Sequence, residues 1–164
     1  SFPTRRSSDR SEERRVGKEC IAIFLISIGT ISASSASAQS SKDLSMMGVS
    51  SWSALECSAL ASVLEDTKEQ ERLFRIGYES GKKFIAAVQS KRITEEDLNN
   101  EVPSGFLLVM AGPTSDFILG RVFESAVDNV TKNIFSSGTG LNSKELQKSL
   151  AQNKFAQKNC RLLR

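Results

Sequence analysis

The residues of this sequence that could carry out chemistry are few, and no histidine is among them. Histidine is the usual general base and the commonest metal ligand, so imidazole catalysis and histidine-ligated metal sites are excluded. Ser136 and Ser137, in the stretch SSGTG, have no recognisable base to activate them and are typical of a turn. The acidic run 95–97 is expected to be a solvated helix start rather than an acid–base pair. We therefore predict no enzyme activity and no cofactor or metal.

The remaining polar candidates lie on two long apolar stretches and are Tyr78, Glu79, Asp116 and Arg121. Tyr78 and Asp116 each lie beside glycines, so a small polar site between two helices is one interpretation. Core packing and helix capping is the other, and we favour it. If a groove exists there, its predicted residues are Gly77, Tyr78, Gly81, Asp116 and Gly120.

The element that must position Tyr78 is the stretch 66–90, DTKEQERLFRIGYESGKKFIAAVQS, and we expect the rest of the chain to be organised around it. Three- and four-residue spacing predicts an amphipathic helix. Gly77 and Gly81 on its apolar face each cost about 1 kcal/mol relative to alanine. We expect close approach of another helix to compensate, and a ligand in the gap is the alternative. The predicted apolar face comprises Leu73, Phe74, Gly77, Tyr78, Gly81, Phe84, Ile85 and Val88.

The helix predicted to cross that one begins at GPTSD, residues 112–116, and runs to about Phe135. Proline and aspartate suit the first helical turn. Gly120 would provide a second point of close approach. The residues predicted to face inward are Phe117, Gly120, Phe123, Val127, Val130 and Ile134, with Val122 and Ala126 at the flank.

Shorter elements complete the predicted domain. A helix over 51–64 carries Cys57 on its flank, Thr94 opens a short acidic helix, and Asn142 or Ser143 caps a last helix. The apolar run 106–111, FLLVMA, fits a buried strand or a buried helix, and we choose helix because no partner strand is evident. The predicted fold is an all-α, small orthogonal bundle of four to five helices.

The N-terminal part has a different character. Residues 1–20, SFPTRRSSDRSEERRVGKEC, are rich in Arg, Ser and Glu and resemble translated sequencing-adapter sequence, so we exclude them from the fold. A basic arm for nucleic acid is the alternative. The apolar run 21–31, followed by Ala36-Ser37-Ala38, predicts a signal peptide over 21–38, and a buried helix is the alternative. We expect residues 39–50 to be a flexible lead-in and residues 51–164 to be the helical domain.

Cleavage after Ala38 changes the charge and cysteine arguments. Residues 39–164 carry 16 basic and 15 acidic residues, so the net charge falls from +3 to +1. A balanced domain lacks the clustered basic face of a nucleic-acid-binding protein. Cys57 and Cys160 remain, and an even pair in an exported chain predicts one disulfide. Free thiols or an intermolecular bridge are the alternatives.

Three sequence motifs carry a resemblance: G-Y-x-x-G-K-x-F at 77–84, D-F-I-L-G-R-V-F-E at 116–124, and N-C-R-L-L at 159–163. Together they resemble small exported helical proteins of Gram-negative bacteria. The resemblance implies an all-helical fold and a periplasmic or secreted location, and it assigns no activity.

We accordingly expect a non-catalytic interaction or structural protein with an envelope protein partner. No stable membrane insertion is expected after signal cleavage, and the oligomeric state is left open. The first alternative is a domain that binds a small molecule or lipid. The second is an immunity protein against a cell-wall-degrading toxin, which is similar in size, disulfide use and fold class only.

Overall fold

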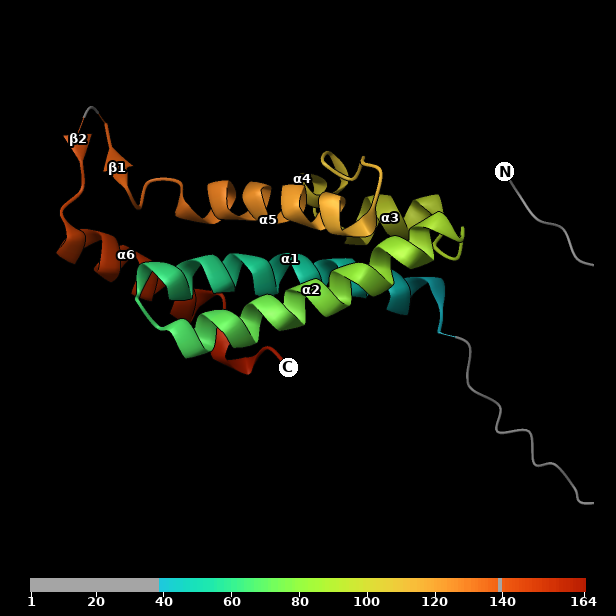
Figure 1. Cartoon of the computed structure of the whole chain (residues 1–164), viewed down its shortest axis with the longest axis horizontal. Helices are drawn as coiled ribbons and strands as arrows, with labels where there is room; N and C mark the ends of the chain where they lie inside the picture. Colours follow the sequence, from blue (N-terminus) through green and yellow to red (C-terminus); the bar gives the residue numbers. More distant parts are fainter. Residues whose placement is uncertain (1–38, 139) are drawn as a thin grey trace, which may run out of the picture. The chain divides into compact units, whose positions relative to one another are not determined.

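The computed structural model of the protein describes residues 39–138 and 140–164 (Figure 1). The predictions for residues 1–20 and 21–38 lie outside this range. The described residues confirm the all-α bundle. Their elements are α1 (Ser41–Val63), α2 (Thr67–Gln89), α3 (Glu95–Glu101), α4 (Ser104–Leu107), α5 (Ser115–Thr131), β1 (Ser136–Ser137), β2 (Gly140–Leu141), α6 (Lys144–Gln157) and the 3₁₀ helix η1 (Cys160–Leu162).

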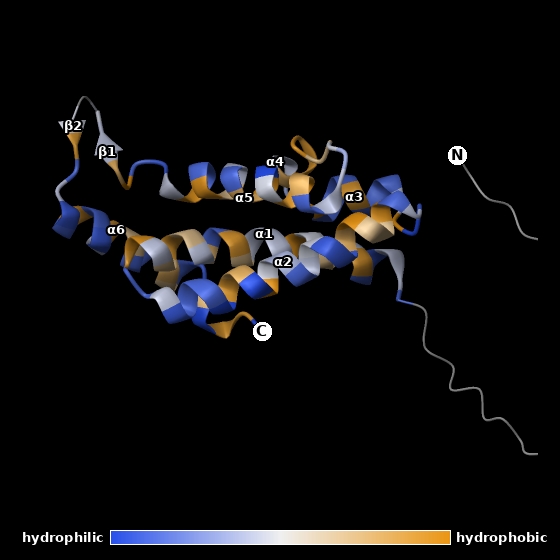
Figure 2. Cartoon of the chain, viewed as in Figure 1, coloured by the Kyte–Doolittle hydropathy of each residue, from blue (hydrophilic) through white to orange (hydrophobic). Residues whose placement is uncertain are grey.

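The helix around which the others pack is α1, and not α2 as the sequence predicted. It contacts α2, α3, α5, α6 and η1, and most of its residues from Trp52 to Ala61 are buried. Its serines are satisfied internally, because Ser51 donates to the Gly77 carbonyl oxygen (2.7 Å) and Ser58 donates to that of Gln70 (3.0 Å). A helix buried on all sides has no polar face, so its periodicity is weak. Figure 2 shows few strongly hydrophilic residues along α1 and many along α6.

The first turns of α1 correct the prediction of a flexible lead-in at 39–50. Ser40 and Asp43 form a capping box, in which each side chain hydrogen-bonds the backbone of the other. Leu44 is buried, and Gly48 lies beneath the ring of Phe84. Serine-rich sequence is typical of loops, but here small residues allow neighbouring side chains to cover the helix closely.

The helix α2 agrees closely with the prediction. Asp66 caps its N-terminus by accepting from the Glu69 amide, and the helix ends one residue before Ser90. Its most buried side chains, Leu73, Phe84 and Ile85, belong to the predicted apolar face. An amphipathic helix with a wet side is the case in which spacing predicts structure best.

Gly77 and Gly81 permit close packing, as expected. A Cβ on Gly77 would lie 2.7 Å from Cγ of Leu55 and 3.2 Å from its backbone nitrogen, so the helix that approaches there is α1. A Cβ on Gly81 would collide with Leu119 of α5 and lie 2.7 Å from the Ser51 hydroxyl oxygen. Both neighbours therefore occupy the space that a side chain would need.

The buried face of α5 is rotated from the predicted one. Ile118, Leu119 and Val122 are buried against the rest of the bundle, whereas Phe117 is 52% exposed. Two apolar stripes compete on this helix, and the aliphatic one fits the tightly packed surface of α1 and α2 better. The helix also ends at Thr131 and not near residue 135. Two residues later, Asn133 takes a left-handed conformation (φ 66°), which does not continue a right-handed helix.

The run 106–111 is helical only at its start. Phe106, in α4, is buried and meets Phe84 edge to face, with ring centroids 5.0 Å apart. The chain then turns, leaving Leu108 82% exposed. The turn predicted at SSGTG joins β1 to β2, which pair antiparallel with Ser136 opposite Leu141.

The C-terminal segment is tied to α1 by the predicted disulfide between Cys57 and Cys160, which is confirmed. Both cysteines are fully buried, and their Cα atoms are 5.5 Å apart. The neighbouring Glu56 carboxylate is buried and accepts from the partly exposed Lys158 at 2.8 Å and from Asn129 at 2.6 Å. None of the helices in the described part of the chain is long and apolar enough to cross a membrane.

Candidate functional site

Three of the five predicted groove residues come together in a small apolar pocket between α1, α2 and α5, which we call the aromatic groove. Its volume is about 150 Å³. Tyr78, Asp116 and Gly120 line it, whereas Gly77 and Gly81 are covered by Leu55 and Leu119. The groove therefore exists next to the predicted glycine contacts and not over them.

Aromatic side chains form the accessible walls of the groove. Phe74 meets Phe123 of α5 edge to face, with centroids 5.4 Å apart, and it stacks on Tyr78 at 6.1 Å. The Phe74 side chain is 42% exposed, although an aromatic ring gains free energy by burial. Leu55 and Leu119, both buried, complete the lining. The result is an apolar hollow with a partly exposed aromatic border.

A polar network closes one side of the aromatic groove. The Tyr78 hydroxyl donates to Oδ1 of Asp116 at 2.7 Å, and Nζ of Lys82 lies 3.4 Å from that oxygen. Lys82 also donates to the Tyr78 oxygen and lies 5.3 Å from the centre of its ring. A shared site for Tyr78 and Asp116 was the less favoured interpretation of the sequence, and Lys82 was not among the predicted residues, although the four-residue spacing from Tyr78 places it on the same helix face.

The network fixes the charges of its members. The Tyr78 hydrogen bond and the nearby Lys82 ammonium lower the pKa of Asp116 below its usual value. The pKa of Lys82 is raised by its hydrogen bond to Tyr78 and by the Asp116 charge. Near neutral pH, Asp116 therefore stays an acceptor and Lys82 a donor. This arrangement can orient a polar partner, and it gives neither group the poise of a general base.

The other two polar candidates lie away from the groove lining. Arg121 donates to the Ala111 carbonyl oxygen at 2.5 Å and so attaches the preceding loop to α5. Glu79 is exposed on α2. Within the described residues, no group of three or more Cys, Asp or Glu residues is arranged to hold a metal ion.

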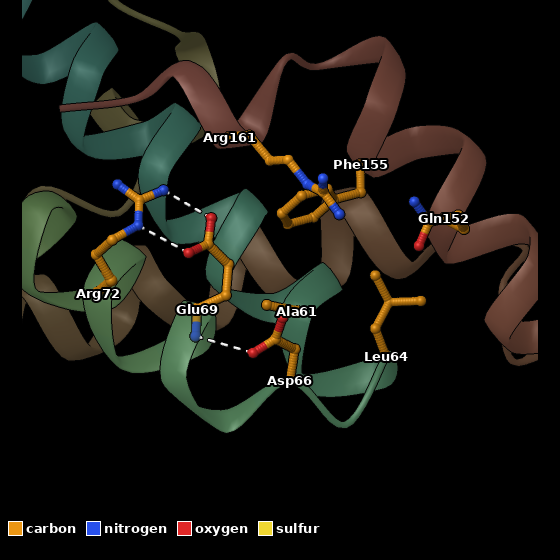
Figure 3. Close-up of a pocket in the computed structure, with 8 residues that line it drawn as sticks. All are labelled: Ala61, Leu64, Asp66, Glu69, Arg72, Gln152, Phe155 and Arg161. Atoms are coloured by element: carbon orange, nitrogen blue, oxygen red, sulfur yellow. Dashed lines mark hydrogen bonds and ion pairs between the residues drawn. The ribbon is translucent and has the colours of Figure 1, made fainter.

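A second, more polar hollow lies at the N-terminal end of α2, and sequence reasoning missed it. This C-terminal cleft has a volume of about 430 Å³ and is lined by the α1–α2 turn, α2, α6 and η1 (Figure 3). Its apolar lining residues are Ala61, Leu64 and Phe155, and its polar ones are Asp66, Glu69, Arg72, Gln152 and Arg161.

The C-terminal cleft is assembled by contacts between distant parts of the chain. Arg72 donates to both carboxylate oxygens of Glu69, at 2.8 and 2.7 Å, and to the Leu163 carbonyl oxygen at 2.6 Å. The first contact lowers the pKa of Glu69. The predicted disulfide could have indicated this cleft, because a bond from Cys57 to Cys160 brings the adjacent Arg161 close to α1.

Comparisons of the chain with protein-family models, curated proteins and solved structures found no match in any of the three. The function must therefore be argued from the residues of this chain alone.

Proposed function

We propose that this protein is an exported, non-catalytic interaction protein, and that the aromatic groove is where a protein partner in the cell envelope docks. The observation that carries the proposal is the pairing of an apolar hollow with partly exposed Phe74 and a charged rim at Asp116 and Lys82. Interaction hot spots have this composition, with a buried anchor surrounded by polar groups.

The size of the aromatic groove supports a protein partner over the alternative of a small molecule or lipid. Small-molecule sites usually enclose roughly 300–1,000 Å³. The groove holds about 150 Å³, which is room for one apolar side chain rather than a whole lipid. Its rim presents an acceptor at Asp116 and a donor at Lys82, so we expect the partner to place polar groups of both kinds beside an apolar anchor.

Export is supported by the cysteine chemistry. Disulfides persist in the periplasm and outside the cell and are rare in the cytosol. Both cysteines are fully buried in a bridge that joins α1 to η1. The intact mass of the protein purified from the cell envelope should equal that of a chain starting at Gln39. A mass that includes residues 21–38 would contradict cleavage.

Site-specific photo-crosslinking tests the docking proposal. A photo-reactive phenylalanine analogue replaces Phe74 in the full chain. Phe135, which is 45% exposed against 42% for Phe74, is the matched control position outside the groove. We expect one stoichiometric crosslinked protein from position 74 and none from position 135. Identical products from both positions would contradict the proposal.

A blocking variant makes the same experiment sharper. Gly120 lines the groove, and a Cβ at this position meets nothing within 4 Å, so we expect Gly120→Leu to occupy the groove, with an unchanged melting temperature as the check that the fold is retained. We expect it to reduce crosslinking at least about tenfold, as loss of a hot-spot anchor does. Unchanged crosslinking would exclude the groove. A lipid bound to the purified protein and displaced by this substitution would instead favour the ligand-binding alternative.

A further inference from the structure

The C-terminal cleft differs from the aromatic groove in both size and chemistry. Its volume of about 430 Å³ lies within the range of small-molecule sites. Its lining residues come from the α1–α2 turn, from α2, and from α6 and η1 (Figure 3). The cleft depends on the tertiary fold, because the hydrogen bond from Arg72 to the Leu163 carbonyl oxygen joins parts of the chain that lie 91 residues apart.

Most charged groups of the cleft are already used by the protein. The Arg72 guanidinium is divided between Glu69 and the Leu163 carbonyl oxygen, and both Glu69 oxygens accept from it. Oδ1 of Asp66 accepts from the Glu69 amide. Arg161 and Gln152 form no hydrogen bond with the other residues of the cleft (Figure 3), although the Arg161 charge adds to Arg72 in lowering the pKa of Glu69. One guanidinium, one amide and the second oxygen of Asp66 are therefore left to meet a ligand.

These groups present opposite charges from opposite walls. Arg161 belongs to η1 and Asp66 to the α1–α2 turn, while the apolar side chains of Leu64 and Phe155 line the same cleft. A guanidinium binds a carboxylate through two parallel hydrogen bonds, and a carboxylate pairs with an ammonium group. The charges that remain sum to zero, so a ligand that carries both charges is preferred to an anion or a cation.

From this charge arrangement we propose that the C-terminal cleft binds a small zwitterion with an apolar side chain, either a free amino acid or a short peptide with free termini. The ligand carboxylate pairs with Arg161, its ammonium group pairs with Asp66, and its side chain lies against Leu64 and Phe155. The disulfide at Cys160 and the Arg72 contact to the Leu163 carbonyl hold η1, and with it Arg161, in place.

Isothermal titration of the disulfide-bonded full chain with four matched probes tests the ligand class. Leucine carries both charges, 4-methylpentanoate carries only the carboxylate, 3-methylbutylamine carries only the ammonium group, and leucyl-leucine distinguishes a peptide from an amino acid. We expect saturable binding of leucine or leucyl-leucine, with each singly charged probe at least about tenfold weaker, because a charge-assisted hydrogen bond is lost. No saturable heat with either zwitterion at millimolar concentration overturns the proposal.

Three variants separate a binding role from a structural one. Arg161→Gln should weaken zwitterion binding at least about tenfold. Asp66→Asn keeps the helix cap, because asparagine caps as well as aspartate, and should remove the preference for leucine over 4-methylpentanoate. Arg164→Gln, outside the cleft lining, is the control that leaves binding unchanged. Equal affinities in the wild type and Arg161→Gln, with matching melting temperatures, would also overturn the proposal.

This inference is independent of the proposed function, because the two sites share no lining residue. Gly120→Leu should abolish partner crosslinking and leave leucine binding unchanged, and Arg161→Gln should do the reverse. Each proposal can thus fail while the other stands.

Discussion

At the scale of single residues, the surroundings of each glycine decide its role. Gly81 lies under Leu119 and the Ser51 hydroxyl, whereas Gly120 has nothing within 4 Å of the position where a Cβ would lie. Both sit inside helices, so both carry the same intrinsic penalty. The sequence assigned them the same role because spacing along a helix does not reveal which face is covered.

The two glycines should therefore respond oppositely to alanine. Gly120→Ala should raise the free energy of unfolding by about 0.5–1 kcal/mol, because alanine restricts the unfolded chain and favours helix. Gly81→Ala should lower it by about 1–3 kcal/mol, because the added methyl overpacks the contact with Leu119. Urea denaturation of both variants measures the difference. A shift of the same sign in both would contradict the assignment.

The Tyr78 hydroxyl should control the titration of Asp116. Since the folded pKa of Asp116 is lowered, its stabilising contribution is present above the unfolded pKa and is lost as pH falls through the folded pKa. Tyr78→Phe removes the largest cause, so the folded pKa of Asp116 should rise, and the loss of stability should become smaller and be complete at a higher pH. Carbon-13 NMR of the carboxyl groups measures it. Asp97 is the internal control, because Ser41 and Thr94 lower its pKa, and it should not move.

At the scale of elements, the accuracy of each predicted helix boundary depended on how many sides of that helix are buried. The bounds of α2 were predicted to within a residue because one side is wet and the apolar spacing is therefore visible. The predicted start of α1 lies ten residues too late, because residues 41–50 are rich in serine and lack the regular apolar spacing of an amphipathic helix. The buried serines Ser51 and Ser58 are tolerated inside the bundle because each donates a hydrogen bond to a backbone carbonyl oxygen of α2.

The N-terminal cap should be required for the early turns of α1. Ser40→Ala removes the side chain that accepts from the Asp43 amide, so it should cost about 1 kcal/mol of unfolding free energy. Hydrogen exchange should accelerate in the turns after Ser41 and stay unchanged at the centre of the helix. Ser53→Ala, inside α1, is the control and should be neutral or slightly stabilising. Uniform exchange across α1 would show that the cap is not local.

At the scale of the whole molecule, a single covalent bond joins the ends of the described fold. The disulfide spans 103 positions, so the loop that it closes is most of the domain. Loop closure restricts the unfolded chain, and the chain-entropy model gives about 4–5 kcal/mol for a loop of roughly this size. The prediction was reachable from sequence because the chain has only two cysteines outside the excluded segment.

Replacing both cysteines by alanine should therefore lower the free energy of unfolding by about 4–5 kcal/mol in that model. The C-terminal segment should loosen first, because η1 then depends on Arg72 for its attachment. Urea denaturation with and without reductant measures the loss, and the double variant itself is the control that reductant should not affect. An unchanged midpoint in the double variant would contradict a stabilising role.

Two ion pairs of equal length should differ in their contribution. Lys158–Glu56 and Lys148–Glu65 are both 2.8 Å long, but the Glu56 side chain is 3% exposed and that of Glu65 is 70% exposed. Lys158→Met should cost about 2–3 kcal/mol, because it leaves a buried carboxylate without its cation. Lys148→Met should leave the free energy of unfolding nearly unchanged, because solvent screens an exposed pair. Similar losses in urea denaturation would contradict the role of burial.

The sequence by itself determined the fold class, the span of α2 and the partners of the disulfide. Each of these depends on the spacing of neighbouring residues or on a residue type that occurs only a few times, and both can be seen in the sequence. Only the tertiary structure decided that α1 is central, that α5 buries its aliphatic stripe and that Arg161 and Asp66 line the same cleft. These depend on which surfaces fit together, and packing complementarity is a property of all the elements at once.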